Sequence, residues 1–134
     1  TYPDARRLLV TADGGGSGGS RNRPWQFELQ RFARRQQRRI SVCHLPPGTS
    51  KWNKIEHRMF CHITRNWRGR PPVSHEVVVN LIGATTTEAG LAIRSELDEG
   101  HYPAGRRITD EQMDALSIRR DSFRSEWNYS LLPR

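Results

Sequence analysis

The pattern that most restricts the fold lies in the first third of the chain. An apolar run in residues 7–12 predicts a strand, and a glycine-rich segment, residues 14–20, follows it. A helix is predicted over residues 25–38 and a second short strand over residues 40–44. Elements of these lengths predict a right-handed βαβ crossover with parallel strands. Since the apolar residues of the first strand are consecutive rather than alternating, we expect that strand to be central and covered on both faces.

The predicted helix over residues 25–38 is amphipathic. One stripe is apolar and packs on the sheet, and the opposite stripe is rich in arginine. The arginine stripe is either a solvated surface or a contact to the phosphates of DNA. The apolar stripe consists of Trp25, Leu29, Phe32 and Ala33, and the arginine stripe of Arg31, Arg34, Arg35 and Arg38.

A second helix is predicted over residues 53–67, after a loop that Pro46 and Pro47 stiffen. At about 100° per residue, Glu56 falls inside the apolar stripe of this helix, in its first turn. Burying an ionised carboxylate is costly, and the helix N-terminus offsets only part of that cost. A metal or a catalytic role explains the position, and a buried, hydrogen-bonded structural glutamate is the alternative. The stripe consists of Ile55, Met59, Ile63 and Trp67.

Asp13 stands where the first strand gives way to glycines. Ligands of open α/β sheets usually bind at the carboxyl ends of the strands. The βαβ geometry places Asp13 at one such end and Glu56 just past the end of the neighbouring strand. Carboxylates brought together in this way hold divalent metal for phosphoryl transfer. The alternative is an aspartate that caps a turn into the glycines.

The chain is strongly basic, with a net charge of +8 and a pI near 10.7. Lys51 and Lys54 are its only lysines, so arginine supplies almost all of the excess. The guanidinium fork matches phosphate oxygens bidentately, which favours a polyanion such as nucleic acid as partner. Alternatively, a GC-rich genome has replaced Lys by Arg on an ordinary surface. No apolar run approaches the roughly 18 residues of a membrane span, and no signal peptide is present.

Two other site types are rejected on spacing. The glycine-rich segment lacks the Gly-Lys-Ser/Thr ending of a Walker A loop and the glycine spacing of a dinucleotide fingerprint. The pairs Cys43-His44 and Cys61-His62 are adjacent in sequence, which is not the spacing of zinc ligands. Two cysteines make no disulfide framework, so a reducing cytosol is the default.

The second half of the chain gives weaker signals. A helix capped by Ser74 is predicted to about residue 87, and an alternating apolar pattern predicts a possible strand over residues 91–97. The capping box in residues 109–112 opens a short helix that ends near residue 116. Beyond Ser117 the sequence predicts no element.

Several segments resemble the catalytic region of a bacterial insertion-sequence transposase of the Rhodopirellula type. They are Ala12–Ser17, Ser20–Arg23 and, above all, His44–Arg58, which ends in Ile-Glu-His-Arg. Residues 66–69, 81–87 and 126–129 fit the same pattern, so the resemblance covers nearly the whole chain. A similar order of Leu-Pro-Pro, Asn and Ile-Glu-His occurs in the mariner-like superfamily.

The resemblance implies an RNase H-like α/β fold, here in part: a parallel βαβ core and C-terminal helices, with the first strands upstream. Residues 1–90 would be the C-terminal part of the catalytic domain, and residues 91–134 an extension of it. The family's triad of two aspartates and one glutamate binds two Mg²⁺ or Mn²⁺ ions. Asp13 matches the second aspartate and Glu56 the glutamate. Asp4 does not match the first, which is expected upstream, and Gly18 stands where the family pattern has Asn.

The implied function is transposition of an insertion sequence through metal-dependent DNA strand cleavage and strand transfer. The ions activate water or a DNA 3′-hydroxyl and stabilise the leaving oxygen. Without the first aspartate, this chain alone is expected to be inactive. The implied partners are transposon ends, target DNA and further copies of the protein, in a bacterial cytoplasm at the nucleoid. The expected DNA contacts are Arg31, Arg34, Arg35, Arg38, Lys51, Trp52, Lys54 and His57.

Some alternatives stay open. Trp52 and Trp67 are expected to pack, although Trp52 could stack on a base instead, and His57 could be a plain surface histidine. The chain could be a non-catalytic basic DNA-binding module or a transposase remnant, which would be indifferent to Asp13→Asn. An RNase H-like nuclease unrelated to transposition would share the acidic residues but not the segment that precedes Glu56.

Overall fold

The structure is a computed structural model that describes residues 2–134, apart from the side chain of Ser50. These residues form two compact units. The first unit contains the residues up to Asn53 together with Pro103–Arg134, and the second is Lys54–Tyr102. No helix in the described part of the chain has the length and hydropathy that a membrane span requires.

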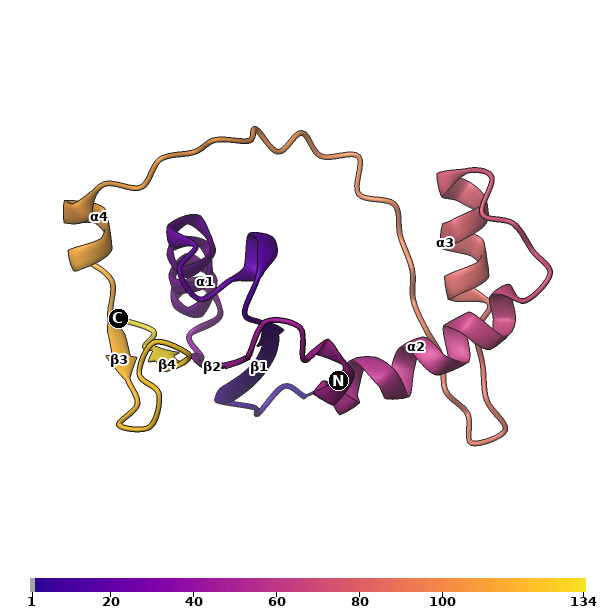
Figure 1. The fold of residues 1–134 in the computed structure, drawn as a ribbon, viewed down its shortest axis with the longest axis horizontal. Coiled ribbons are helices and arrows are strands. Elements are labelled where there is room, and N and C mark those ends of the chain that lie inside the picture. The colour runs from indigo at the N-terminus through magenta and orange to yellow at the C-terminus, as the bar shows by residue number, and fades with distance from the viewer. Residues whose placement is uncertain (1) are drawn as a thin grey trace. The chain divides into compact units, whose positions relative to one another are not determined.

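The first unit is built on a four-stranded mixed sheet in the order β1-β2-β4-β3 (Figure 1). Strands β1 and β2 are parallel, β4 is antiparallel to β2, and β3 is antiparallel to β4. The predicted parallel strand–helix–strand unit is therefore confirmed, in a mixed α/β architecture compatible with the RNase H-like fold. The elements are β1 (Arg7–Asp13), α1 (Arg23–Gln36), β2 (Arg39–Leu45), α4 (Asp110–Asp114), β3 (Ile118–Arg120) and β4 (Asn128–Leu131).

Strand β1 lies at an edge of this sheet, so the prediction of a central strand covered on both faces is wrong for the described residues. Leu8 is 41% exposed and Leu9 is 59% exposed. A run of apolar residues indicates that neither face of a strand is charged, but it does not determine which strands pair with it. An exposed apolar edge of this kind is a surface on which proteins self-associate.

The C-terminal strands β3 and β4 were missed by sequence reasoning, and the strand predicted over residues 91–97 is wrong. Strand β4 pairs with β2, with Ser41 opposite Ser130 and Val42 opposite Tyr129. Residues 91–97 form no strand, and only an isolated bridge joins Thr86 to Ala92. Alternation alone does not make a strand when no partner chain segment satisfies its backbone hydrogen bonds.

The hydrophobic core lies between α1 and one face of the sheet. Its fully buried members come from α1, β2 and β4, so residues from both ends of the chain form one core. Val10, Leu29 and Ile118 are partly buried and pack against it. The buried cluster consists of Ala33, Ile40, Val42, Tyr129 and Leu131.

Helix α1 also buries two glutamines, which an apolar-stripe pattern does not predict. Gln30 is 0% exposed; its amide group donates to the Leu132 carbonyl at 2.6 Å and accepts from the Ser117 N–H at 3.0 Å. Gln26 donates to the Ser20 carbonyl at 2.7 Å. Both polar side chains are satisfied in the interior, as buried polar groups must be. They fasten the C-terminal segment and the glycine-rich loop to α1.

The second unit is a helix pair, α2 (Lys54–Trp67) and α3 (His75–Gly83), shown in magenta and pink in Figure 1. Asn66 on α2 donates a hydrogen bond to the Leu81 carbonyl of α3 at 2.6 Å. The Ser74 N-cap is confirmed, with its hydroxyl accepting from the Val77 N–H at 3.2 Å. Helix α3 ends at Gly83, before the predicted end near residue 87.

The Thr109 capping box that opens α4 is likewise confirmed. Its hydroxyl accepts from the Gln112 N–H at 3.2 Å, and the Gln112 side chain accepts from the Thr109 N–H at 3.0 Å. These reciprocal bonds satisfy backbone donors of the first turn, which is why so short a helix forms here. Arg23 pairs with the exposed Asp110 at 2.6 Å, between α1 and α4.

Candidate functional site

Asp13 is the last residue of β1 and lies opposite Leu45 at the carboxyl end of the parallel pair. Its side chain is exposed. Within the described residues, its carboxylate forms neither an ion pair nor a side-chain hydrogen bond, in a chain with 22 lysines and arginines. The predicted position at the strand end is therefore confirmed, and the carboxylate oxygens are free to bind a cation.

Gly14, the first residue after β1, packs closely against the loop that contains Pro46 and Pro47. A Cβ at residue 14 would lie 2.7 Å from the Leu45 carbonyl oxygen and 3.2 Å from Pro47 Cδ. The loop then folds back on itself, since a Cβ at Gly19 would lie 3.1 Å from the Gly14 carbonyl oxygen. These close approaches require glycine at both positions, so packing explains them without a bound nucleotide.

Asn53 connects the Pro-Pro-Gly segment to the strand that ends in Asp13. Its side-chain oxygen accepts a hydrogen bond from the Thr11 hydroxyl at 3.2 Å. Asn53 is 5% exposed and Thr11 is half-buried, so this polar contact is partly shielded from water. Thr11 lies two residues before Asp13 on β1. The bond therefore holds the end of residues 45–53 near the carboxyl end of β1.

Glu56 lies in the first turn of α2 and is half-buried. Within residues 2–134 its carboxylate has neither an ion-pair partner nor a side-chain hydrogen bond. The apolar stripe around it is only partly a core: Ile63 is buried, whereas Ile55 is 65% and Met59 is 42% exposed. Asp13 and Glu56 belong to different compact units, so their pairing is a prediction from the sequence rather than a measured distance.

His44 is a buried residue beside Asp13 that sequence reasoning treated only as part of a rejected zinc pair. Its Nε2 lies 3.0 Å from the Tyr129 hydroxyl, and its Nδ1 lies 3.4 Å from the Asp13 main-chain oxygen. Burial lowers the pKa of His44, and the hydrogen bond to the Asp13 carbonyl opposes part of that effect. Its alternation with Ile40 and Val42 along β2 was the signal that it faces the core.

A stability measurement checks the lowered pKa of His44. Its pKa is lowered in the folded protein, so below its ordinary value of 6.5 the unfolded chain binds more protons. The free energy of unfolding should therefore fall as the pH drops from 6.5 towards the folded-state pKa, and level off below it. In EDTA, urea titrations of His44→Gln should lose part of this dependence. The exposed control His101→Gln should keep all of it, and identical pH profiles for both variants would contradict the assignment.

The arginine stripe of α1 makes several contacts within the protein. Arg31 pairs with Glu28 at 2.9 Å, and Arg34 donates to the main-chain carbonyls of Ala115 and Arg134. Arg38 lies 3.4 Å and 3.3 Å from the carbonyls of residues 2 and 3, and Arg35 lies over the Phe32 ring. The stripe therefore holds both chain ends against α1, a structural role that the sequence did not reveal.

The remaining predicted DNA contacts are all exposed. Trp52 is 59% exposed, so the expectation that it packs is wrong, while Trp67 is half-buried as expected. Lys51 precedes Trp52 in the first unit, and Lys54 and His57 lie at the start of α2 in the second. Each of these side chains is accessible to a ligand.

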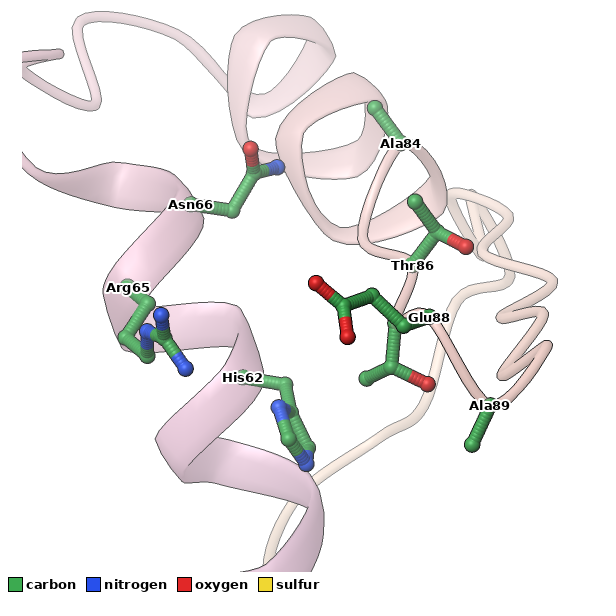
Figure 2. Close-up of a pocket in the computed structure, with 8 residues that line it drawn as sticks. His62, Arg65, Asn66, Ala84, Thr86, Glu88 and Ala89 are labelled. Carbon is green, nitrogen blue, oxygen red and sulfur yellow. The ribbon is translucent and has the colours of Figure 1, made fainter.

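A pocket of about 700 Å³ in the second unit contains none of the predicted site residues (Figure 2). Helix α2 contributes His62, Arg65 and Asn66, and Ala84 with residues 86–89 forms the opposite side. The Glu88 side chain points from that loop toward α2 (Figure 2). No group of three or more His, Cys, Asp or Glu side chains in the described part of the chain is placed to hold a metal ion.

Comparison with known families gives a match over nearly the whole chain. The model of the Rhodopirellula transposase DDE domain matches residues 1–133. Searches of curated proteins and of solved structures found no match. The matched range contains Asp13, Asn53 with its hydrogen bond to Thr11, and Glu56.

Proposed function

The chain belongs to the Rhodopirellula transposase DDE-domain family, and from this premise we propose that it acts in metal-dependent DNA strand cleavage and strand transfer during transposition of an insertion sequence. The family gives a transposase role in general, with DNA as substrate and divalent metal as the usual cofactor. The proposal adds the reaction, the assignment of Asp13 and Glu56 as metal ligands, and a complex with several copies of the chain.

The hydrogen bond between Thr11 and Asn53 is the observation that carries the assignment. It holds Asn53 near the strand end that presents Asp13. Only Lys54 and Ile55 separate Asn53 from Glu56, so the covalent chain limits the Cα distance between Asn53 and Glu56 to about 11 Å. This short covalent tether supports the proposal that the two carboxylates share one site.

The donor set suits magnesium or manganese. Both are hard cations that prefer carboxylate oxygens, and neither carboxylate is engaged by a basic side chain of the described residues. When bound, such ions stabilise the charge on the attacking and leaving oxygens of an in-line displacement at phosphorus. Two carboxylates are few for two ions, so we propose that the triad is completed by an aspartate that no residue of this sequence matches.

The basic side chains would hold the DNA backbone. Exposed basic side chains precede and follow Asn53 in the sequence: Lys51, Lys54 and His57. Trp52 presents an exposed ring on which a base can stack. The α1 arginines, of which Arg35 lacks a polar partner in the described residues, would be separate phosphate contacts. Phosphate contacts of this kind make binding salt-sensitive and largely independent of sequence.

Cleavage assays test the proposal. Residues 1–134 alone should bind Mg²⁺ weakly and not cut DNA. Mg²⁺ requires near-octahedral oxygen coordination, and Asp13 and Glu56 supply too few oxygen ligands to fix two ions. Adding a family segment that carries the first aspartate, in cis or in trans, should give Mg²⁺-dependent cleavage that Glu56→Gln abolishes. Glu76→Gln is the matched control, since Glu76 is also in the first turn of a helix and is exposed. Robust cleavage by residues 1–134 alone, or by Glu56→Gln, would overturn the assignment.

A non-catalytic basic DNA-binding module is the second candidate, which the net charge of +8 favours. Such a module binds DNA equally well with Asn or Asp at residue 13, in Mg²⁺ and in EDTA. The cleavage assay above separates the two candidates when Asp13→Asn is included, because only the catalytic function predicts cleavage with the added segment and its loss in Asp13→Asn.

A further inference from the structure

A second polar surface lies on the sheet face opposite the hydrophobic core. Side chains alternate between the faces of a strand, so residues that flank the buried Ile40 and Val42 on β2 point away from α1. Ser41 lies opposite Ser130, which in turn lies opposite Arg119. Arg39 lies two residues before Ser41 on the same face. Together these side chains line a pocket of about 370 Å³, here called the serine–arginine pocket.

Hydrogen bonds organise the floor of this pocket. An Arg39 terminal nitrogen donates to the Ser130 hydroxyl at 2.9 Å, and the hydroxyls of Ser41 and Ser130 are 3.0 Å apart. The Arg39 Nε is buried and has no partner among the described residues. A buried, charged N–H group without an acceptor is unfavourable, so this donor is suited to an oxygen supplied by a ligand.

The charge of the pocket is positive. Arg39, Arg119 and Arg120 line it, against one carboxylate, Asp121. Asp121 already accepts a hydrogen bond from the Phe123 N–H at 2.9 Å. None of the three arginines forms an ion pair within residues 2–134. Guanidinium and hydroxyl donors around a hollow match the oxygens of a phosphate group and exclude a metal cation.

We propose that the serine–arginine pocket binds a backbone phosphate of DNA, away from the site of cleavage. This inference rests on the proposed action on DNA. Arg39 lies opposite Arg7 at one end of the parallel pair, and Asp13 lies at the other end, six residues along β1. At about 3.3 Å per residue, the Arg39 end of the pocket is roughly 20 Å from Asp13 along the strands. DNA following the strands would reach Arg39 about six base pairs from the proposed metal site.

Salt-dependent binding tests this inference in EDTA, where metal chemistry plays no part. The affinity of a 30-base-pair duplex should fall about tenfold in Arg39→Gln/Arg119→Gln, and the slope of log K against log salt should decrease by roughly 0.9 for each lost phosphate contact. Arg68→Gln/Arg70→Gln removes the same charge from exposed positions and should change the affinity less. Arg119→Gln alone, on an edge strand, should show a smaller effect in the same direction with an unchanged unfolding midpoint.

The outcomes separate the two proposals. If the wild type binds DNA and both double variants bind it equally, the pocket is not a DNA contact, while the proposed function stands. If the wild type does not bind DNA, the proposed function fails as well. The Arg39 Nε–H resonance should shift with DNA. A shift with millimolar inorganic phosphate but none with DNA would identify a free-phosphate site and overturn the DNA assignment.

Discussion

Asp13→Asn should weaken Mn²⁺ binding by roughly tenfold or more, and Glu56→Gln should have a similar effect. Each change keeps the shape of the side chain and removes the anionic oxygen that a hard cation prefers. Asp13 is exposed and Glu56 half-buried, and neither has an ion-pair partner in the described residues, so the unfolding free energy should change little. Calorimetric titration measures the affinity, and Asp4→Asn, also exposed, is the matched control.

The double variant shows whether one site is involved. If both carboxylates hold the same ions, Asp13→Asn/Glu56→Gln should lose much less affinity than the sum of the two single losses, because the first change already destroys the site. Strict additivity of the two losses would indicate two independent, weak carboxylate contacts, and the shared-site assignment would then be abandoned.

Leu131→Ala should destabilise the first unit by about 2–5 kcal/mol, a large part of the stability of a small domain. Leu131 is 0% exposed on β4, where it lies opposite Ile40 on one side and Ile118 on the other. Removing its side chain leaves a cavity at the centre of the sheet. Urea unfolding followed by tryptophan fluorescence measures the loss.

Leu9→Ala is the control for the core variant. Leu9 is 59% exposed on the edge strand β1, so its truncation should change the free energy of unfolding by less than about 0.5 kcal/mol. Equal destabilisation by the two variants would mean that β4 does not form the core described above, and that β1 is covered in solution.

Elements with local signals were predictable from the sequence. The parallel pair of β1 and β2, the helix between them and the caps at Ser74 and Thr109 each depend on residues close together in the chain. The transposase family was suggested by the segments around Asp13 and Glu56, and the match over residues 1–133 confirms it. Local chemistry and a specific motif were sufficient for these conclusions.

Contacts between distant residues were not predictable in this way. Strand β4 is only four residues long, which is too short for a recognisable periodicity in the sequence. It forms because it pairs with β2, which is distant in the chain. Gln30 is buried because Ser117 and Leu132 satisfy its amide, and those partners come from the far end of the chain. Nothing local distinguishes such a glutamine from one on a solvated surface.

The candidate site was predictable in part. Two predicted positions are confirmed: Asp13 lies at a strand end, and Glu56 lies in the first turn of a helix. The Asn53 bond to Thr11 and the His44 contacts depend on tertiary packing, so no spacing rule predicts them. The roles of Asp13 and Glu56 as metal ligands stay predictions.

Manganese relaxation by NMR tests the central claim most directly, because paramagnetic Mn²⁺ broadens amide signals near its binding site. A substoichiometric addition to residues 1–134 should broaden the amides around Asp13 and around Glu56 together, at the same Mn²⁺ concentration. Asp13→Asn should remove both effects at once, while Asp4→Asn should remove neither. Broadening around only one of the two carboxylates, or around Glu56 unchanged in Asp13→Asn, would contradict a shared metal site.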